Sequence, residues 1–119
     1  MKRTLIRYKT KPETTEENQR LIENVFRELQ TKSVDGFRYV VLKLGDGSFL
    51  HFFEAEDGAS PMAGIEAFQL FQAGVRDRCL EPPQVSEAAV IGNYRMLEGI
   101  PVMWRRSLHV GSNWRIPAG

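Results

Sequence analysis

Hydrophobic and polar residues alternate along residues 4–11, and this two-residue period predicts a β-strand. Residues 14–31 then carry apolar side chains at spacings of three and four, which is typical of an amphipathic helix. The apolar positions of that helix are Leu21, Ile22, Val25, Phe26 and Leu29. Thr14 and Glu17 have the spacing of a capping box, so we expect the helix to begin at Thr14.

Two further strands are predicted on either side of a tight turn. Residues 37–44 are rich in Tyr, Val and Leu, and residues 49–54 form the return strand. The Asp-Gly pair at 46–47 favours a two-residue hairpin loop, which would place Leu42 opposite His51. A one-residue bulge would shift this pairing and exchange the faces of one strand, so both registers stay open.

A second helix and a last strand complete the pattern. Ser60 and Pro61 are typical of a helix start, and Pro82 and Pro83 are expected to end the helix. The apolar positions between them again recur every three or four residues, at Ile65, Phe68, Phe71, Val75 and Cys79. Alternation over residues 85–96 predicts the last strand.

The order β-α-β-β-α-β is that of the ferredoxin-like plan, an α+β fold with an antiparallel sheet and two helices on one face. We assign residues 1–98 to this single domain, which holds 13 basic and all 15 acidic side chains. Residues 99–119 show no sustained period and contain Arg105, Arg106 and Arg115 without an acid. They are predicted to form a flexible, basic C-terminal tail.

The strands are apolar on both faces, which a sheet covered on one side does not require. On residues 49–54, Phe49 and Phe53 share one face while Leu50 and Phe52 share the other. Leaving either face bare would expose a large apolar patch, which is unusual for a soluble monomer. Burial at about 25 cal/mol per Å² would contribute several kcal/mol. We therefore expect a homodimer through the open sheet face, with the C-terminal segment as the competing cover.

The run SFLHFFEAE at 48–56, followed by Ser-Pro at 60–61 and Phe-Gln at 68–69, resembles the antibiotic-biosynthesis-monooxygenase-like family of the dimeric α/β-barrel superfamily. The resemblance covers about residues 3–97 and includes the order of strands and helices. It implies that two subunits pair their sheets into a dimeric α/β barrel with a cavity in each subunit. Some members oxidise phenolic polyketides or quinols without a metal or flavin, some degrade haem, and many have no known activity.

His51 is the main candidate for chemistry, because an imidazole that titrates near neutrality lies there between phenylalanines. In the expected register it shares a face with Arg38 and Phe53, as a polar corner in an apolar pocket. His51 would then be the base or orienter of a phenolate and Arg38 its anion partner, with Tyr39, Phe53 and Phe68 contacting the substrate. The alternative is a structural histidine, hydrogen-bonded in the core or the dimer interface.

Tyrosine hydroxyls are a second source of polar groups for such a pocket. Tyr8, Tyr39 and Tyr94 could each supply one, although tyrosines on half-buried strands more often only pack. Cys79 lies on an apolar stripe, and we interpret it as an inert core residue.

Several other chemistries are not supported by the residues. His51, His109 and the single cysteine have no metal-ligand spacing, and no nucleotide fingerprint or GxSxG motif occurs, so no metal or cofactor is expected. A histidine on a strand also argues against haem. A net charge of +1 gives no general attraction to nucleic acid. One cysteine and the lack of a long apolar run favour a cytoplasmic protein without a membrane contact.

Two functions remain open at this stage. The first is a homodimer that binds a small aromatic or quinone-like molecule and oxidises it as a cofactor-independent monooxygenase, since an electron-rich substrate anion can itself react with oxygen. The second is a non-enzymatic binding or stress-associated dimer whose pocket is small or filled by its own phenylalanines. An open volume beside His51 would favour the first, and a packed face the second.

Overall fold

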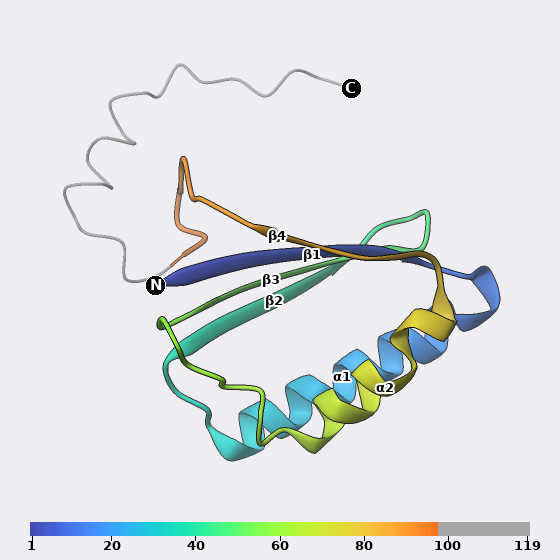
Figure 1. The fold of residues 1–119 in the computed structure, drawn as a ribbon, viewed down its shortest axis with the longest axis horizontal. Coiled ribbons are helices and arrows are strands. Elements are labelled where there is room, and N and C mark those ends of the chain that lie inside the picture. Colours follow the sequence, from blue (N-terminus) through green and yellow to red (C-terminus); the bar gives the residue numbers. More distant parts are fainter. Residues whose placement is uncertain (98–119) are drawn as a thin grey trace. The chain divides into compact units, whose positions relative to one another are not determined.

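A computed structural model describes residues 1–97, and the predicted tail lies outside these residues. Its elements are β1 (Lys2–Thr10), a short 3-10 turn η1 (Pro12–Thr14), α1 (Thr15–Lys32), β2 (Phe37–Lys43), β3 (Ser48–Ala55), α2 (Glu66–Arg78) and β4 (Cys79–Glu87). The strands form one antiparallel sheet in the order β2-β3-β1-β4, and both helices cover the same face of it (Figure 1). The predicted α+β ferredoxin-like fold is confirmed.

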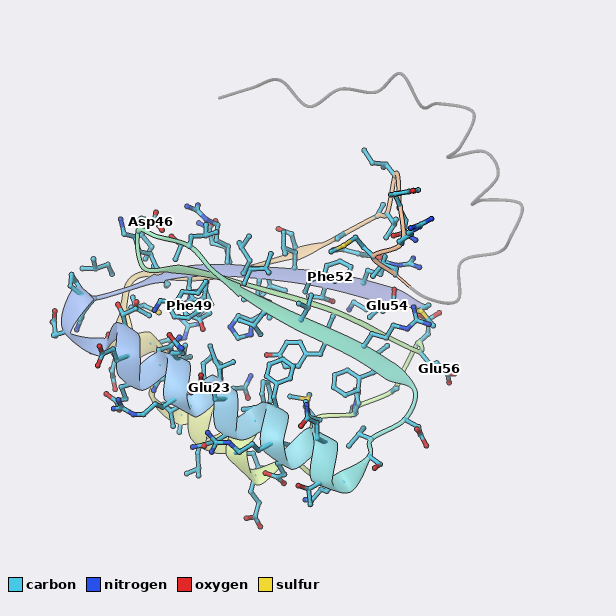
Figure 2. All side chains as sticks on the ribbon, turned by 180° about the vertical axis from the view of Figure 1, so that it is seen from behind. Glu23, Asp46, Phe49, Phe52, Glu54 and Glu56 are labelled. Atoms are coloured by element: carbon cyan, nitrogen blue, oxygen red, sulfur yellow. The ribbon has the colours of Figure 1, made fainter. Side chains whose placement is uncertain are left out.

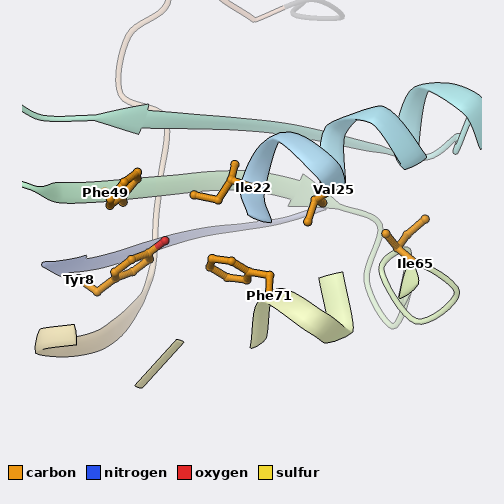
Figure 3. Packing of buried hydrophobic residues seen from close by; sticks show 6 residues of the cluster. All are labelled: Tyr8, Ile22, Val25, Phe49, Ile65 and Phe71. Carbon is orange, nitrogen blue, oxygen red and sulfur yellow. The ribbon is translucent and has the colours of Figure 1, made fainter. Parts of the chain in front are cut away.

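The core lies between the sheet and the two helices. Phe49 points from β3 into this layer (Figure 2) and is 1% exposed. Figure 3 shows the six residues of the buried cluster, which are Tyr8, Ile22, Val25, Phe49, Ile65 and Phe71. The apolar stripes predicted for both helices contribute to this cluster or pack against it.

The first helix begins close to its predicted start, but its N-terminus lacks the predicted side-chain cap. Thr14 makes no capping hydrogen bond, so the predicted capping box is wrong. Its Oγ1 instead lies 3.0 Å from the carbonyl oxygen of Lys11 and 2.8 Å from that of Arg78. The Thr14 hydroxyl therefore donates to backbone carbonyl groups, one of which belongs to Arg78, the last residue of α2.

The second helix begins later than predicted, because its cap comes from the neighbouring helix. Ser60 lies in a series of turns, and α2 begins at Glu66. The Glu28 carboxylate of α1 accepts hydrogen bonds from the backbone amides of Glu66 (3.1 Å) and Ala67 (2.8 Å). Lys32 and these amides lower the pKa of Glu28. The free amides at the helix start are thus satisfied across the helix pair rather than by the preceding residues.

The last strand was predicted at residues 85–96, and its bounds were wrong, because only residues 85–87 of that range belong to it. The strand β4 follows directly on α2 and contains Pro82 and Pro83. It lies at the edge of the sheet, where a proline without an N–H group can be accommodated, and its pairing with β1 has register shifts. Residues 89–97 are irregular, and the Asn93 Oδ1 accepts from the amides of Met96 and Leu97.

In the hairpin between β2 and β3, three loop residues (45–47) lie between the hydrogen-bonded residues Leu44 and Ser48, instead of the expected two. The Leu44 amide donates to the Ser48 carbonyl (2.8 Å), and Gly47 between them has φ +86°. A turn of this length with a left-handed glycine at its third position carries a bulge. His51 therefore pairs with Val41 and not with Leu42. The bulged register that the sequence left open is the one that forms.

Candidate functional site

A cavity of about 650 Å³ lies between the covered face of the sheet and α2. Its apolar lining includes Ile6, Phe37, Phe53, Met62, Phe68, Phe71 and Val85. Its polar lining includes Tyr8, Tyr39, His51, Gln72, Arg76 and Asp77. Several of these residues, such as Arg76 and Asp77, are exposed, so the cavity opens to solvent. A second hollow of about 670 Å³ shares Phe53, Met62 and Phe68 with it and continues toward the loop before α2.

His51 forms the polar corner of this cavity and is only 3% exposed. Its Nε2 lies 2.7 Å from the Tyr8 hydroxyl, and its Nδ1 lies 2.6 Å from the Tyr39 hydroxyl. These tyrosines come from the two strands that flank β3, at positions diagonal to His51 on the same face. Both ring nitrogens are therefore engaged by hydroxyl groups of neighbouring strands.

The network continues into both helices. Asn18 of α1 donates from Nδ2 to the Tyr8 hydroxyl (2.9 Å), and Arg78 of α2 donates from Nε to Asn18 Oδ1 (2.9 Å). Arg78 also donates from Nη2 to the carbonyl oxygen of Phe71 (2.8 Å). Asn18 is 0% exposed and Arg78 is 6% exposed. Tyr8 and His51 are buried as well, whereas Tyr39 at the end of the network is half-buried.

Burial sets the protonation states within the network. It lowers the pKa of His51 from 6.5 to about 4, and it raises the pKa of Tyr8 and of Tyr39 above the ordinary value. At neutral pH the imidazole is therefore neutral and both hydroxyls keep their protons. Each group has one proton to donate, so the direction of every hydrogen bond is constrained by its neighbours.

Most of the predicted site residues meet at the cavity. Tyr39, Phe53 and Phe68 line it together with His51. Tyr8 lines the cavity as well. Tyr94 does not line it and lies after the compact unit Met1–Ala88.

The prediction that Arg38 stands beside His51 was wrong. The bulged hairpin turns Arg38 to the opposite face of the sheet, where it pairs with Glu54 across β3. Its Nη1 lies 3.4 Å from Glu54 Oε1, and Arg3 of β1 lies 2.8 Å from Oε2 of the same carboxylate. Arg38 therefore belongs to an ion-pair group on the open face and not to the cavity.

Sequence reasoning did not identify Asn18 and Arg78 as members of the site. Both occupy apolar-stripe positions of their helices, since Asn18 lies four residues before Ile22 and Arg78 three residues after Val75. A polar residue at a core-facing position must find a buried partner, and that was the available signal.

The described residues give no sign of a metal centre or of a membrane-spanning helix. Residues 1–97 contain no group of three or more His, Cys, Asp or Glu side chains placed to hold a metal ion. No helix within that range is long and apolar enough to cross a bilayer.

No protein-family model matches the chain, and no curated protein matches it. Solved structures do match. A structure named antibiotic biosynthesis monooxygenase is 18% identical, with a TM-score of 0.61 over 76% of this chain and 99% of that chain. Rv0793 from Mycobacterium tuberculosis is 16% identical, with a TM-score of 0.61 over 77% and 96% of the two chains. A protein from Bacteroides thetaiotaomicron, proposed to be an antibiotic biosynthesis monooxygenase, is 16% identical, with a TM-score of 0.64 over 82% and 95%. The chain has the ferredoxin-like fold of these proteins, as the sequence resemblance predicted.

Proposed function

We propose that this protein binds a small aromatic molecule in the cavity beside Tyr39 and His51. The observation that carries this proposal is a mostly apolar cavity of about 650 Å³ with one polar corner. Cavities of about 300–1,000 Å³ with a few placed polar groups are typical of small-molecule sites. The aromatic lining would remove a planar ligand from water, and the Tyr39 hydroxyl would orient its oxygen.

The finer proposal is a cofactor-independent monooxygenase that acts on a phenolic or quinone-like compound. A phenol that binds as its anion loses its proton to solvent through the open side of the cavity. The ring carbon opposite the oxygen then reacts with O₂, so that one oxygen atom becomes the second carbonyl of a quinone and the other leaves as water. The substrate supplies all the electrons, and the protein supplies orientation and a dry site. A solved structure with this fold is named antibiotic biosynthesis monooxygenase, and that name supports this class of reaction.

In this mechanism Tyr39 contacts the substrate oxygen, and His51 acts as a positioning residue. Both nitrogens of His51 are held by tyrosine hydroxyls, so the imidazole reaches a ligand through Tyr39. The orienting role that the sequence allowed for His51 is therefore the one we retain, and the direct-base role is not.

A non-enzymatic binding protein is the second candidate. The observation that favours it is again at His51, because a buried imidazole with a pKa of about 4 and no free nitrogen is a poor general base. Oxygen uptake on a panel of phenols and quinols separates the two candidates, since a binding protein consumes none.

We also propose that the protein is a homodimer through its open sheet face. No helix of the unit Met1–Ala88 covers this face (Figure 1), and Val40 and Leu42 on it are 45% and 53% exposed. Leu5, Leu50 and Phe52 on the neighbouring strands extend the same apolar surface. In a two-fold dimer the same surface of each subunit would cover that of the other.

Calorimetric titration of the full chain with naphthol tests the binding proposal. Ala73 lines the cavity from an exposed position of α2, so Ala73→Trp is expected to fill the cavity and weaken binding by at least about tenfold. Leu70 is exposed on the same helix and does not line the cavity, so Leu70→Trp is the matched control and should bind like the wild type. Equal binding by both variants, or none by the wild type, would contradict the proposal.

A further inference from the structure

Arg78 carries a buried positive charge whose described partners are all neutral. They are the Asn18 side chain, the Phe71 carbonyl group and the Phe71 ring, whose centroid lies 5.3 Å from the guanidinium carbon. A Cβ atom at Gly74 would lie 2.9 Å from Nη1, so the glycine makes room for the guanidinium. Burying a charge without a counter-ion is costly, which makes the group that receives its hydrogen bond of interest.

The guanidinium determines the orientation of the Asn18 amide. Arginine can only donate, so the Asn18 atom that faces Arg78 Nε must be the amide oxygen. The Asn18 nitrogen then faces Tyr8 and donates to its hydroxyl. Tyr8 has one proton left, and its remaining partner is Nε2 of His51 at 2.7 Å.

The imidazole passes this direction on to the cavity. When Nε2 accepts from Tyr8, the proton of the neutral ring lies on Nδ1 and is donated to the Tyr39 hydroxyl at 2.6 Å. Tyr39 already accepts that bond, so its own proton is available to the cavity that it lines. The chain Arg78, Asn18, Tyr8, His51 and Tyr39 thus donates in one direction throughout.

The reverse direction leaves one buried hydroxyl without an acceptor. If Nε2 carried the proton, Tyr8 would accept from both Asn18 and His51. Its own proton would then have no acceptor among its described partners, and Tyr8 is only 2% exposed. An unmade hydrogen bond in the interior is costly, so the direction toward the cavity is favoured.

We propose that Arg78 and Asn18 fix the direction of this chain, so that the cavity selects the oxyanion form of an aromatic alcohol at the Tyr39 hydroxyl. This inference rests on the proposed function, because it requires a ligand in the cavity. Aligned hydrogen bonds polarise one another, and a donor to an oxyanion forms a charge-assisted bond that is stronger than one to a neutral hydroxyl. A neutral phenol can accept the same hydrogen bond but gains less from it, since its oxygen carries no charge.

The other charged groups around the cavity do not oppose this selection. The titratable side chains that line it are Tyr8, Tyr39, His51, Arg76 and Asp77. Arg76 and Asp77 are exposed and of opposite charge, and β4 contributes Pro83 and Val85 to the lining. The buried cation of Arg78 is therefore the main fixed charge behind the polar corner.

The test uses para-nitrophenol, whose ionised form absorbs at a longer wavelength than its neutral form. Its pKa is measured by absorbance with and without an excess of the full chain. We expect the bound probe to have a pKa lower by at least about one unit, which means that the anion binds about tenfold more tightly than the neutral form. Naphthalene, which has no oxygen, serves as the shape control for occupancy of the cavity.

Two variants locate the origin of the shift. Tyr39→Phe removes the terminal donor and is expected to abolish the pKa shift while naphthalene still binds. Arg78→Met keeps the length of the side chain without its charge and is expected to reduce the shift. An unchanged shift in a folded Arg78→Met would contradict the role of Arg78. If this variant fails to fold, the wild type and Tyr39→Phe still decide whether the Tyr39 hydroxyl selects the oxyanion.

The outcomes separate this inference from the proposal beneath it. If neither naphthalene nor para-nitrophenol binds, the proposed function fails, and this inference falls with it. If para-nitrophenol binds with an unchanged or raised pKa, or if Tyr39→Phe keeps the shift, only the oxyanion selection is overturned.

Discussion

At the scale of single residues, His51 shows how burial changes the chemistry that a residue type suggests. A histidine in water titrates near neutrality, but this one lies between two hydroxyls and is 3% exposed. Its neutral form is hydrogen-bonded at both nitrogens, and its charged form would have to be desolvated. The residue therefore acts in the structure as a neutral link between Tyr8 and Tyr39.

This burial predicts a specific pH dependence of stability. The pKa of His51 is about 4 in the folded state against 6.5 in the unfolded chain, so between these values the unfolded chain binds more protons. The stabilisation is complete above pH 6.5 and is lost as the pH falls toward 4. By pH 4.5 the loss amounts to about 2–3 kcal/mol.

The check compares wild type with His51→Gln by denaturant unfolding at pH 7 and pH 4.5. The variant lacks the titrating ring, whereas His109 and the carboxyl groups are common to both proteins. We expect the wild type to lose more stability on acidification than the variant does. Equal losses would show that His51 titrates normally in the folded protein.

The sequence identified part of the site and missed the part that depends on distant partners. His51, Tyr39, Phe53 and Phe68 stood out by residue type and strand position, and they meet at one cavity. Asn18 and Arg78 are 60 residues apart in the chain, and only the packing of α1 against α2 brings them together. Their stripe positions indicated burial, but no local pattern specified what they would bind.

At the scale of elements, the predictions failed where an element's end is fixed by another element. The helix α2 begins where Glu28 of α1 accepts its free amides, and Ser60 therefore has no role as a cap. The strand β4 tolerates Pro82 and Pro83 because it lies at the sheet edge. The interiors of α1 and β1 were predictable from the periods of their apolar residues. Those of β2 and β3 were predictable from their aromatic and β-branched residues and the turn between them.

The hairpin turn has the largest consequence of any element boundary, because one residue in it decides the face of Arg38. Gly47 adopts φ +86°, a left-handed conformation that non-glycine residues reach only at a cost. Gly47→Ala is expected to destabilise the protein by about 1 kcal/mol, measured by denaturant unfolding. Gly45→Ala is the control, because Gly45 has no positive φ and no atom near its Cβ position. Equal effects of both substitutions would argue against a bulged turn.

At the scale of the whole molecule, the two faces of the sheet pose different problems. The covered face is closed by α1 and α2, and it holds the cavity and the hydrogen-bond chain. The open face holds the Glu54 ion pairs with Arg3 and Arg38, next to exposed Val40 and Leu42. The double-sided apolar pattern in the sequence predicted this second surface.

The dimer proposal concerns this open face and is tested by sedimentation equilibrium. The wild type is expected to sediment at twice the chain mass of 13.6 kDa at micromolar concentration. The double variant Val40→Lys, Leu42→Lys places two charges in the proposed interface, where desolvation and like-charge repulsion oppose association, so it should sediment near 13.6 kDa. Both positions are exposed in the single chain, so the fold should tolerate the change.

The control variant Leu70→Lys adds a charge at an exposed position of α2, on the helix side of the sheet, and should remain dimeric. A wild-type monomer would refute the proposal, whereas dissociation by Leu70→Lys alone would move the interface from the sheet to the helices.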